Sequence, residues 1–293
     1  MRLATLLLPL TVLPSARFNA PPVFAGQAAS AAELSVIATV EGALRESCEA
    51  EQEGSGVSSA WLRERTRTDL LRYTRAVAAG RPVQPAMAAE VEERLLSTAR
   101  WREAEGIDAV AADERYGLES FFEGREAVEA VWLPGRDPAG RVVACFFADR
   151  HTPGSIPTEE WRRCVIHNGE LCVREKGIAE GPNGQLTLIV DRTSSGRANQ
   201  DVGLALALLP ELLAHYPDLL HSVVIAPVNG LFWSVWRVVR LFLSERTAAK
   251  FVLLRSRGRR GGADWRRELR ERVGTDVELP EHLRPSDEAS EAS

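Results

Sequence analysis

The stretch YPDLLHSVVIAPVNGLFWSVWRVVRLFLSERTAAKFVLL, from Tyr216 to Leu254, decides the fold that the sequence predicts. It contains a short apolar run, a break at Pro227 to Gly230, a dense apolar segment, a polar turn and a second apolar run after Lys250. The two runs have the length of buried strands, and the segment between them has the length of a helix. The stretch therefore predicts a strand–helix–strand unit.

The predicted helix, Leu231 to Leu243, is apolar on nearly every side. Its polar residues are Ser234, Arg237 and Arg240. Their spacing of three places them on one narrow stripe, so the remaining faces must be buried or must meet lipid. The pattern does not fit a membrane span, because two arginines and an Asn-Gly break lie inside the only apolar window near 20 residues long. The helix therefore carries more apolar surface than an ordinary surface helix.

Length and composition bound the remaining possibilities. The chain has 293 residues, 45% of them hydrophobic, enough for one large domain or for a helical domain followed by an α/β domain. The net charge of −5 gives no general attraction to nucleic acid, so no nucleic-acid partner is expected. The four cysteines lack CxxC spacing, and Cys164, His167 and Cys172 lack a fourth zinc ligand at a known spacing. With no nucleophile, phosphate-loop or zincin motif present, we predict neither catalytic nor metal-binding residues.

Residues 1–32 predict a targeting leader. Met1 and Arg2 precede an apolar run from Leu3 to Leu13, and proline and small residues follow. A charge, a short apolar core and small residues are the parts of a signal peptide. The expected destination is secretory or organellar, including the plastid; without a working leader we expect a cytoplasmic, peripheral membrane protein. The alternative is a disordered leader or a misplaced start codon.

Residues 33–106 predict a mainly helical module that ends at Gly106. Its apolar residues have helical spacing over 33–50, 60–79 and 85–103.

Residues 107–284 have a different pattern, with short apolar runs between helices. The predicted strands are 130–133, 141–148, 186–190 and the two runs of the opening stretch; the other predicted helices are 158–176, 202–215 and 265–273. This alternation predicts an α/β domain with a mostly parallel sheet. Pro210 is expected to kink or restart its helix. Residues 285–293 are polar and acidic and predict a disordered tail.

Five groups of residues follow one another in a fixed order between residues 65 and 279. They are Asp69-Leu70-Leu71-Arg72-Tyr73 with Ala99-Arg100-Trp101-Arg102; Asp137-Pro138-Ala139-Gly140-Arg141; Leu188-Ile189-Val190-Asp191; Tyr216-Pro217-Asp218; and Leu231-Phe232 with Trp236, Thr247 and Lys250. In order and spacing they resemble the CRAL-TRIO family of lipid-binding proteins, which includes phosphatidylinositol-, tocopherol- and retinaldehyde-binding members. The chain departs from the family's pattern at Pro227 to Asn229, and after Asp191, where the loop is longer than usual.

The resemblance implies an apolar lipid pocket between a sheet floor and a mobile gate helix that also contacts membranes. The residues expected in the pocket and gate are Phe146, Leu188, Val190, Val224, Leu231, Phe232, Val235, Trp236, Val239 and Phe242. Asp218, Thr247 and Lys250 match the positions that hold the inositol phosphate in the phosphatidylinositol binders. Their chemistry suits that role, since lysine offers a charge to phosphate, threonine a hydroxyl, and aspartate an acceptor for sugar hydroxyls.

We therefore expect a non-catalytic protein that binds a lipid, first phosphatidylinositol or a related phospholipid, and transfers it between membranes. A bound lipid takes the place of a cofactor, the expected partners are this ligand and a transient membrane surface, and the expected state is a monomer. Two alternatives stay open. One is a carrier of a neutral isoprenoid such as a tocopherol or carotenoid. The other is a protein-interaction module that has lost lipid binding.

Overall fold

The structure, a computed structural model, describes residues 28–50, 59–123, 129–174, 185–255 and 264–291. Residues 1–27 of the predicted leader lie outside this part of the chain. The remaining leader residues run into the first helix, α1, which begins at Ala31.

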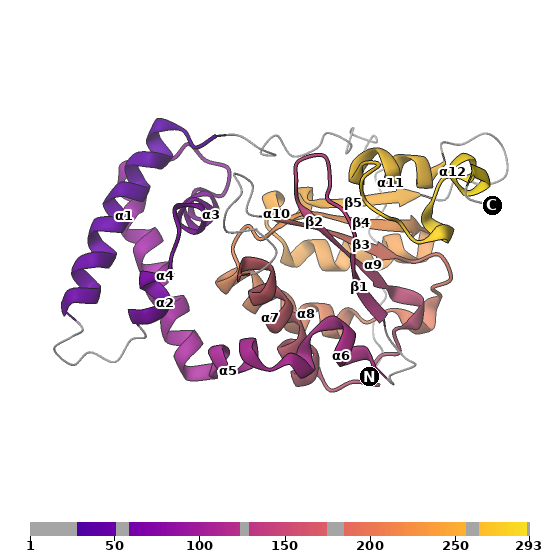
Figure 1. Ribbon diagram of the computed structural model, residues 1–293, viewed down its shortest axis with the longest axis horizontal. Coiled ribbons are helices and arrows are strands. Elements are labelled where there is room, and N and C mark those ends of the chain that lie inside the picture. Colours follow the sequence, from indigo (N-terminus) through magenta and orange to yellow (C-terminus); the bar gives the residue numbers. More distant parts are fainter. Residues whose placement is uncertain (1–27, 51–58, 124–128, 175–184, 256–263, 292–293) are drawn as a thin grey trace, which may run out of the picture.

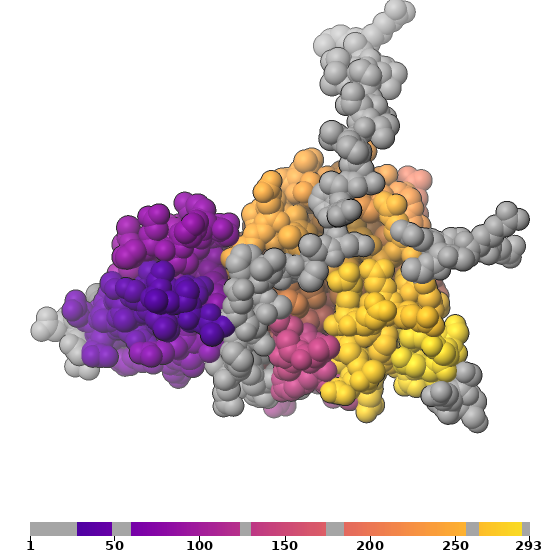
Figure 2. All heavy atoms as spheres, turned by 90° about the horizontal axis from the view of Figure 1, so that it is seen from above, coloured from indigo at the N-terminus to yellow at the C-terminus, as the bar shows by residue number. Residues whose placement is uncertain are grey.

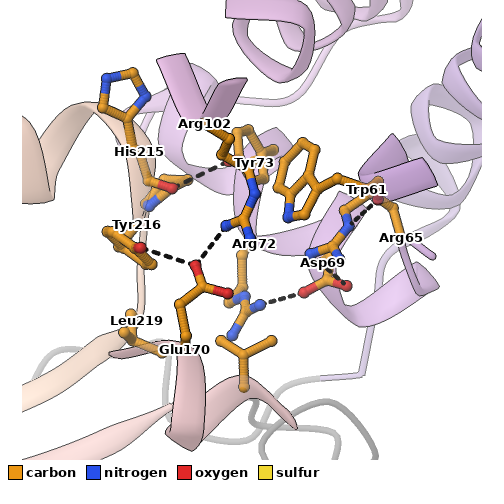
Figure 3. Close-up of a pocket in the computed structure, with 12 residues that line it drawn as sticks. Trp61, Arg65, Asp69, Arg72, Tyr73, Arg102, Glu170, His215, Tyr216 and Leu219 are labelled. Carbon is orange, nitrogen blue, oxygen red and sulfur yellow. Dashed lines mark hydrogen bonds and ion pairs between the residues drawn. The ribbon is translucent and has the colours of Figure 1, made fainter. Parts of the chain in front are cut away.

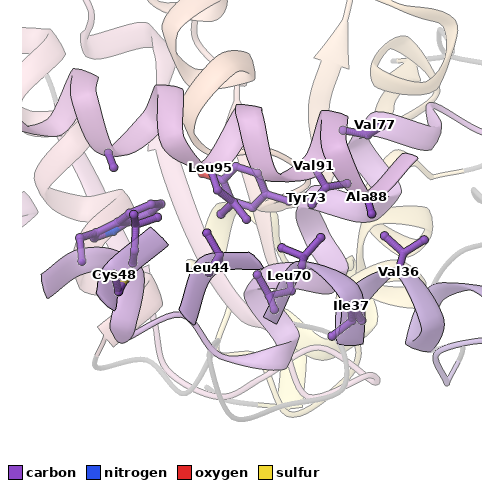
Figure 4. Close-up of a cluster of buried hydrophobic side chains, with 14 residues drawn as sticks. Val36, Ile37, Leu44, Cys48, Leu70, Tyr73, Val77, Ala88, Val91 and Leu95 are labelled. Atoms are coloured by element: carbon purple, nitrogen blue, oxygen red, sulfur yellow. The ribbon is translucent and has the colours of Figure 1, made fainter. Parts of the chain in front are cut away.

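The described residues before 124 form only helices, as predicted for 33–106. These are α1 (Ala31–Ala50), α2 (Ser59–Arg63), α3 (Arg67–Ala78), α4 (Ala88–Glu105), α5 (Ile107–Ala112) and α6 (Leu118–Phe122), with 3₁₀ turns at Pro85–Met87 and Glu114–Tyr116. Buried side chains of α1, α3 and α4, among them Val36, Leu70 and Leu95, form a core of their own (Figure 4). Thr66 and Asp69 form a capping box that starts α3, and Gly106, with φ of 62°, ends α4.

The second part of the chain is built on a five-stranded sheet. Its strands are β1 (Glu129–Leu133), β2 (Val142–Phe147), β3 (Leu186–Asp191), β4 (Leu220–Val228) and β5 (Phe251–Arg255), in the spatial order β1-β2-β3-β4-β5. Strand β1 pairs antiparallel with β2, and the other neighbours are parallel. The prediction of an α/β fold with a mostly parallel sheet behind a helical module is confirmed.

The crossover helices lie on one face of this sheet. Helices α7 (Thr158–Arg174), α8 (Val202–His215), α9 (Gly230–Val239) and α10 (Glu245–Ala249) connect the parallel strands in sequence. When parallel strands follow one another in spatial order, right-handed connections place every helix on the same side. Figure 1 shows α7, α8 and α9 on one side and α11 (Trp265–Val273) on the other. Figure 2, which views the sheet from the α11 side, shows the yellow C-terminal segment spread over that face.

Two expectations about the helices are corrected. Pro210 lies inside a single helix, α8, and does not restart it, while the expected kink stays a prediction. Pro210 is solvent-exposed, so water can reach the backbone carbonyl that its missing N–H leaves free.

The tail predicted to be disordered from 285 contains α12 (Ser286–Glu291). Arg270 of α11 forms an ion pair with Glu288 of this helix at 2.7 Å. This tertiary contact cannot be predicted from the composition of the tail.

The two faces of the sheet are covered to different extents. On the α11 side, Ile189 is 0% and Val224 1% exposed, and both pack with Leu269 of α11 in one closed core. On the α8 and α9 side, Leu188 and Val190 of the same central strand are only half-buried. Successive residues of a strand point to opposite faces. The different exposure of neighbouring side chains in β3 therefore reflects how completely each face of the sheet is covered. One face is therefore sealed, and the other is left partly open.

This asymmetry predicts different costs for the same substitution on the two faces. Val224→Ala should lower the free energy of unfolding by about 2 kcal/mol or more, because it leaves a cavity in a closed core. Val190→Ala should cost about 1 kcal/mol or less, since water already reaches that side chain. Urea denaturation of both variants measures the difference. Equal losses would show that both faces are sealed.

Candidate functional site

The partly open face carries a continuous apolar floor. Its half-buried side chains come from three strands and are Phe146, Leu188, Val190, Phe251 and Leu253. Phe146, Leu188 and Val190, three of the residues expected in the pocket, thus lie on this face. Val224 does not: its side chain belongs to the sealed core on the opposite face. Val223 and Ile225 hold the positions on the open side, so the prediction for Val224 was wrong by one residue of strand register.

Two apolar helices cover this floor incompletely. Helix α8 is rich in leucine, yet none of its residues is fully buried. In α9 only Trp236 is buried, and its ring lies 4.8 Å from that of Phe251 on the floor. Phe232 packs on the same cluster of floor residues, so α9 rests against the sheet. Much of the apolar surface of both helices therefore remains unburied beside an apolar floor.

The rest of the predicted gate is less buried. Val235 and Val239 are half-buried, and Leu231 is exposed. The exposed apolar surface continues past the end of α9 into a 3₁₀ turn, where Leu241 is 82% and Phe242 62% exposed. Arg237 and Arg240 are exposed as well. No helix among the described residues is long and apolar enough to cross a membrane.

The start of α9 is set by one side chain. The Oδ1 atom of Asn229 accepts a hydrogen bond of 3.0 Å from the backbone N–H of Phe232. Asparagine is a favoured N-cap because its side chain satisfies an N–H that has no partner within the helix. The break seen in the sequence at Pro227 to Gly230 is thus the junction between strand β4 and the helix.

Two of the three predicted headgroup residues are brought together at the amino ends of β4 and β5. Asp218, at a φ of 58°, accepts from Lys250 Nζ at 2.5 Å and from Arg246 Nη2 at 2.8 Å. Lys250 also donates to the carbonyl of Leu220 at 2.6 Å. The third residue, Thr247, lies on the same short helix, α10, but its hydroxyl contacts Ser244 at 2.9 Å.

Burial and charge act against each other in this cluster. Burial by itself raises the pKa of the Asp218 carboxyl, but the charges and hydrogen bonds of Lys250 and Arg246 outweigh it and the net pKa is lowered. Burial also lowers the pKa of Lys250 against the opposing effect of Asp218. Two cations therefore share one carboxylate, and the cluster keeps an excess positive charge.

Arg246 was not singled out from the sequence. It lies four residues before Lys250, so both side chains share one face of the helical turn, and this spacing was the available signal. Its second hydrogen bond could not be foreseen: Nη1 donates to the carbonyl of Arg75 at 2.9 Å, near the end of α3. Arg246 thus connects the headgroup cluster to the helical module.

The helical module also binds the end of α8. Arg94 donates to the carbonyl of Leu213 at 2.6 Å, and the hydroxyl of Tyr73 donates to that of His215 at 3.1 Å. These bonds satisfy carbonyls that have no partner within the helix, and the arginine charge suits the negative end of the helix dipole. The ring of Trp101 stacks on His215 at 4.1 Å.

A small polar cavity lies at this junction (Figure 3). Arg102 bridges it by binding Glu170 at 2.5 Å, and Glu170 also accepts from the hydroxyl of Tyr216 at 2.8 Å. The cavity measures about 30 Å³, room for a water molecule but far too little for an acyl chain. The junction therefore braces the Tyr216–Asp218 turn and is not itself a lipid pocket.

The comparison with known families agrees with this geometry. The model of the CRAL/TRIO domain matches residues 127–275, just over half of the chain. The chain belongs to the CRAL/TRIO domain family. The matched residues include the parallel strands, the crossover helices, Asp218 and Lys250, while the helical module lies before them. The resemblance found in the sequence is confirmed.

Solved structures give a weaker likeness. The crystal structure of Sfh5 matches with a TM-score of 0.46 and 16% sequence identity, over 57% of this chain and 60% of that one. The chain thus spans less than two thirds of the length of Sfh5. The search of curated proteins found no match.

A histidine beside the headgroup cluster predicts acid sensitivity. Burial, together with the charges of Arg141 and Lys250, lowers the pKa of His221 to about 4, although Asp137 and Asp218 oppose the shift. The unfolded imidazole takes up a proton near pH 6.5, whereas the folded one does so only near pH 4. The contribution of neutral His221 to the free energy of unfolding is therefore fully present above about pH 6.5. It is lost as the pH falls toward 4, because the unfolded chain takes up the proton first.

We expect the thermal midpoint of the wild type to fall across this interval more than that of His221→Gln. Calorimetry of both proteins at matched ionic strength measures the two slopes. Parallel slopes would show that His221 keeps an ordinary pKa in the folded protein.

Proposed function

We propose that this CRAL/TRIO protein binds a phospholipid, with phosphatidylinositol as the first candidate, and carries it between membranes. Membership of the family supports lipid binding and transfer in general. The observation that carries the proposal is the half-buried apolar floor beneath α9, beside a sealed face on the same strands. Burying an acyl chain there stabilises the complex by about 0.8 kcal/mol per CH₂ group.

The headgroup lies, in this proposal, at the cluster of Asp218, Arg246 and Lys250. A phosphate can take up the excess positive charge of the two basic side chains, and Asp218 can accept from sugar hydroxyls. Thr247 adds a hydroxyl on the same helical turn once it exchanges its contact with Ser244. A neutral headgroup gains less from this cluster.

Helix α9 acts as the gate. In the closed state Trp236 and Phe232 rest on the floor. Leu231, Leu241 and Phe242 face outward and offer apolar contact to a bilayer, with Arg237 and Arg240 beside them for anionic lipid. Contact with the membrane favours the open state, one lipid exchanges, and closure shields it from water. The proposal requires no catalytic step.

The direct test is identification of the bound molecule. Protein purified without detergent is extracted with organic solvent and the extract is analysed by mass spectrometry. A phospholipid in near-stoichiometric amount supports the proposal. A neutral isoprenoid would replace it with the carrier alternative, and the absence of any lipid, with no lipid-dependent shift in melting temperature, would favour the protein-interaction alternative.

Lys250→Met should reduce transfer of phosphatidylinositol between liposomes by about tenfold, the effect of one charge-assisted contact. Methionine keeps the apolar stem, and transfer of phosphatidylcholine should change less. Arg267→Met, which removes an exposed charge from α11 on the opposite face, is the control and should leave both rates unchanged. Unchanged phosphatidylinositol transfer in Lys250→Met would refute the headgroup assignment.

Leu241→Asp and Phe242→Asp should weaken binding to anionic liposomes several-fold without lowering the melting temperature, because both side chains are already exposed. Leu34→Asp on α1 is the matched control, an exposed leucine in the helical module. Liposome co-sedimentation measures the three variants. If the α1 variant weakened binding as much as the other two, the gate would not be the membrane contact.

A further inference from the structure

Arg192 occupies the end of the open apolar floor. Its backbone N–H donates to the carbonyl of Ala226 at 2.6 Å, so the β pairing continues one residue past the end of β3. Leu188, Val190 and Arg192 are spaced by two and therefore line one face. The intervening Asp191 points to the sealed side, where it contacts His282 at 2.6 Å. A row of apolar side chains thus ends in a guanidinium group.

This guanidinium is buried, and no carboxylate of the described residues pairs with it. Arg192 is 5% exposed, and its Nη2 atom has no hydrogen-bond partner among the described residues. The other arginines buried to this degree in that part of the chain each bind an acid: they are Arg72 with Asp69, Arg102 with Glu170 and Arg141 with Asp137. Burial lowers the pKa of Arg192, and no neighbouring carboxylate opposes that effect. Burying an unpaired charge costs free energy, so Arg192 lowers the free energy of unfolding of the ligand-free protein.

The surroundings of Arg192 favour a negative group. Helices α8 and α9 both begin at this carboxyl edge of the sheet, and helix amino ends carry partial positive charge. Three further buried donors have no partner in the described parts of the chain. They lie on the same loop and on α9 and are Ser195 Oγ, Gln200 Nε2 and Trp233 Nε1. The nearby acid Asp201 is occupied, since it caps α8 and contacts His151 at 3.1 Å.

We propose that Arg192 receives the anionic head of a single-chain amphiphile, a long-chain carboxylate, whose chain lies along Val190 and Leu188. The ligand head thus lies at the edge of the sheet opposite to Asp218 and Lys250. The inference rests on the proposed function, because it uses the same apolar floor, and it adds a second ligand class that competes with phospholipid for that floor. A phosphate monoester head offers the same chemistry.

The site also reaches the gate. The Arg192 guanidinium lies 4.3 Å from the centre of the Phe232 ring, a cation–π contact with the first turn of α9. An anion that binds Arg192 therefore acts directly on the residue that holds the gate against the floor. Arg255 makes a similar contact with Trp233 at 4.4 Å but is exposed, which makes it a matched control.

The test is calorimetric titration of the full chain with oleate, oleyl alcohol and inorganic phosphate. The wild type should bind oleate about tenfold more tightly than oleyl alcohol, which has the same chain without the charge. Arg192→Gln should abolish this preference, Arg192→Lys should keep part of it, and Arg255→Gln should keep it in full. Arg192→Met should raise the melting temperature of the ligand-free protein.

Equal affinity of the wild type for oleate and oleyl alcohol, or an unchanged preference in Arg192→Gln, would overturn the proposal. Inorganic phosphate that binds as tightly as oleate would also overturn it, because the apolar floor would then contribute nothing. Phosphatidylinositol transfer is measured in parallel. Loss of phosphatidylinositol transfer in Lys250→Met, with the preference for oleate intact, would support the headgroup assignment independently of Arg192. Each of the two proposals can therefore fail without the other.

Discussion

The structure depends on the unequal covering of its sheet. Parallel strands that follow one another in space, with right-handed connections, place α7, α8, α9 and α10 on a single face. The opposite face would then be bare, and the C-terminal segment with α11 closes it around Ile189, Val224 and Leu269. The sealed face supplies the packed core, which leaves the other face free to hold half-buried apolar side chains. The proposed ligand site and the packed core thereby lie on opposite sides of the same strands.

The helices over the open face are not held equally. The end of α8 is bound by Arg94 and Tyr73 of the helical module, which satisfy its last carbonyls. Helix α9 rests on the floor through few side chains, chiefly Trp236 and Phe232. An element with few buried contacts opens at lower cost than the rest of the fold. The helical module thus fixes one of the helices over the open face, α8, and the Tyr216–Asp218 turn that follows it.

Much of the fold was readable from the sequence, since apolar runs of strand length between amphipathic helices follow directly from local periodicity. Asp218 and Lys250 were singled out through the resemblance to the family's phosphatidylinositol binders, and the structure brings their side chains together. Val224 was misplaced because VVIAPV, from Val223 to Val228, is apolar throughout, so no alternation marks which residues face which side. The isolation of Arg192 was not readable at all. The sequence contains 41 acidic residues but does not say which of them lie beside a given arginine, because that depends on the tertiary structure.

In the proposed complex, lipid lies on the α8 and α9 face of the sheet and not elsewhere. Photo-crosslinking with a phospholipid that carries a diazirine in its acyl chain, followed by peptide mapping, tests this location most directly. We expect adducts on the floor and gate, at β3 residues Leu188 and Val190, at Phe251 and on α9. Adducts confined to the helical module or to α11, or none above the level of a heat-denatured control, would contradict it.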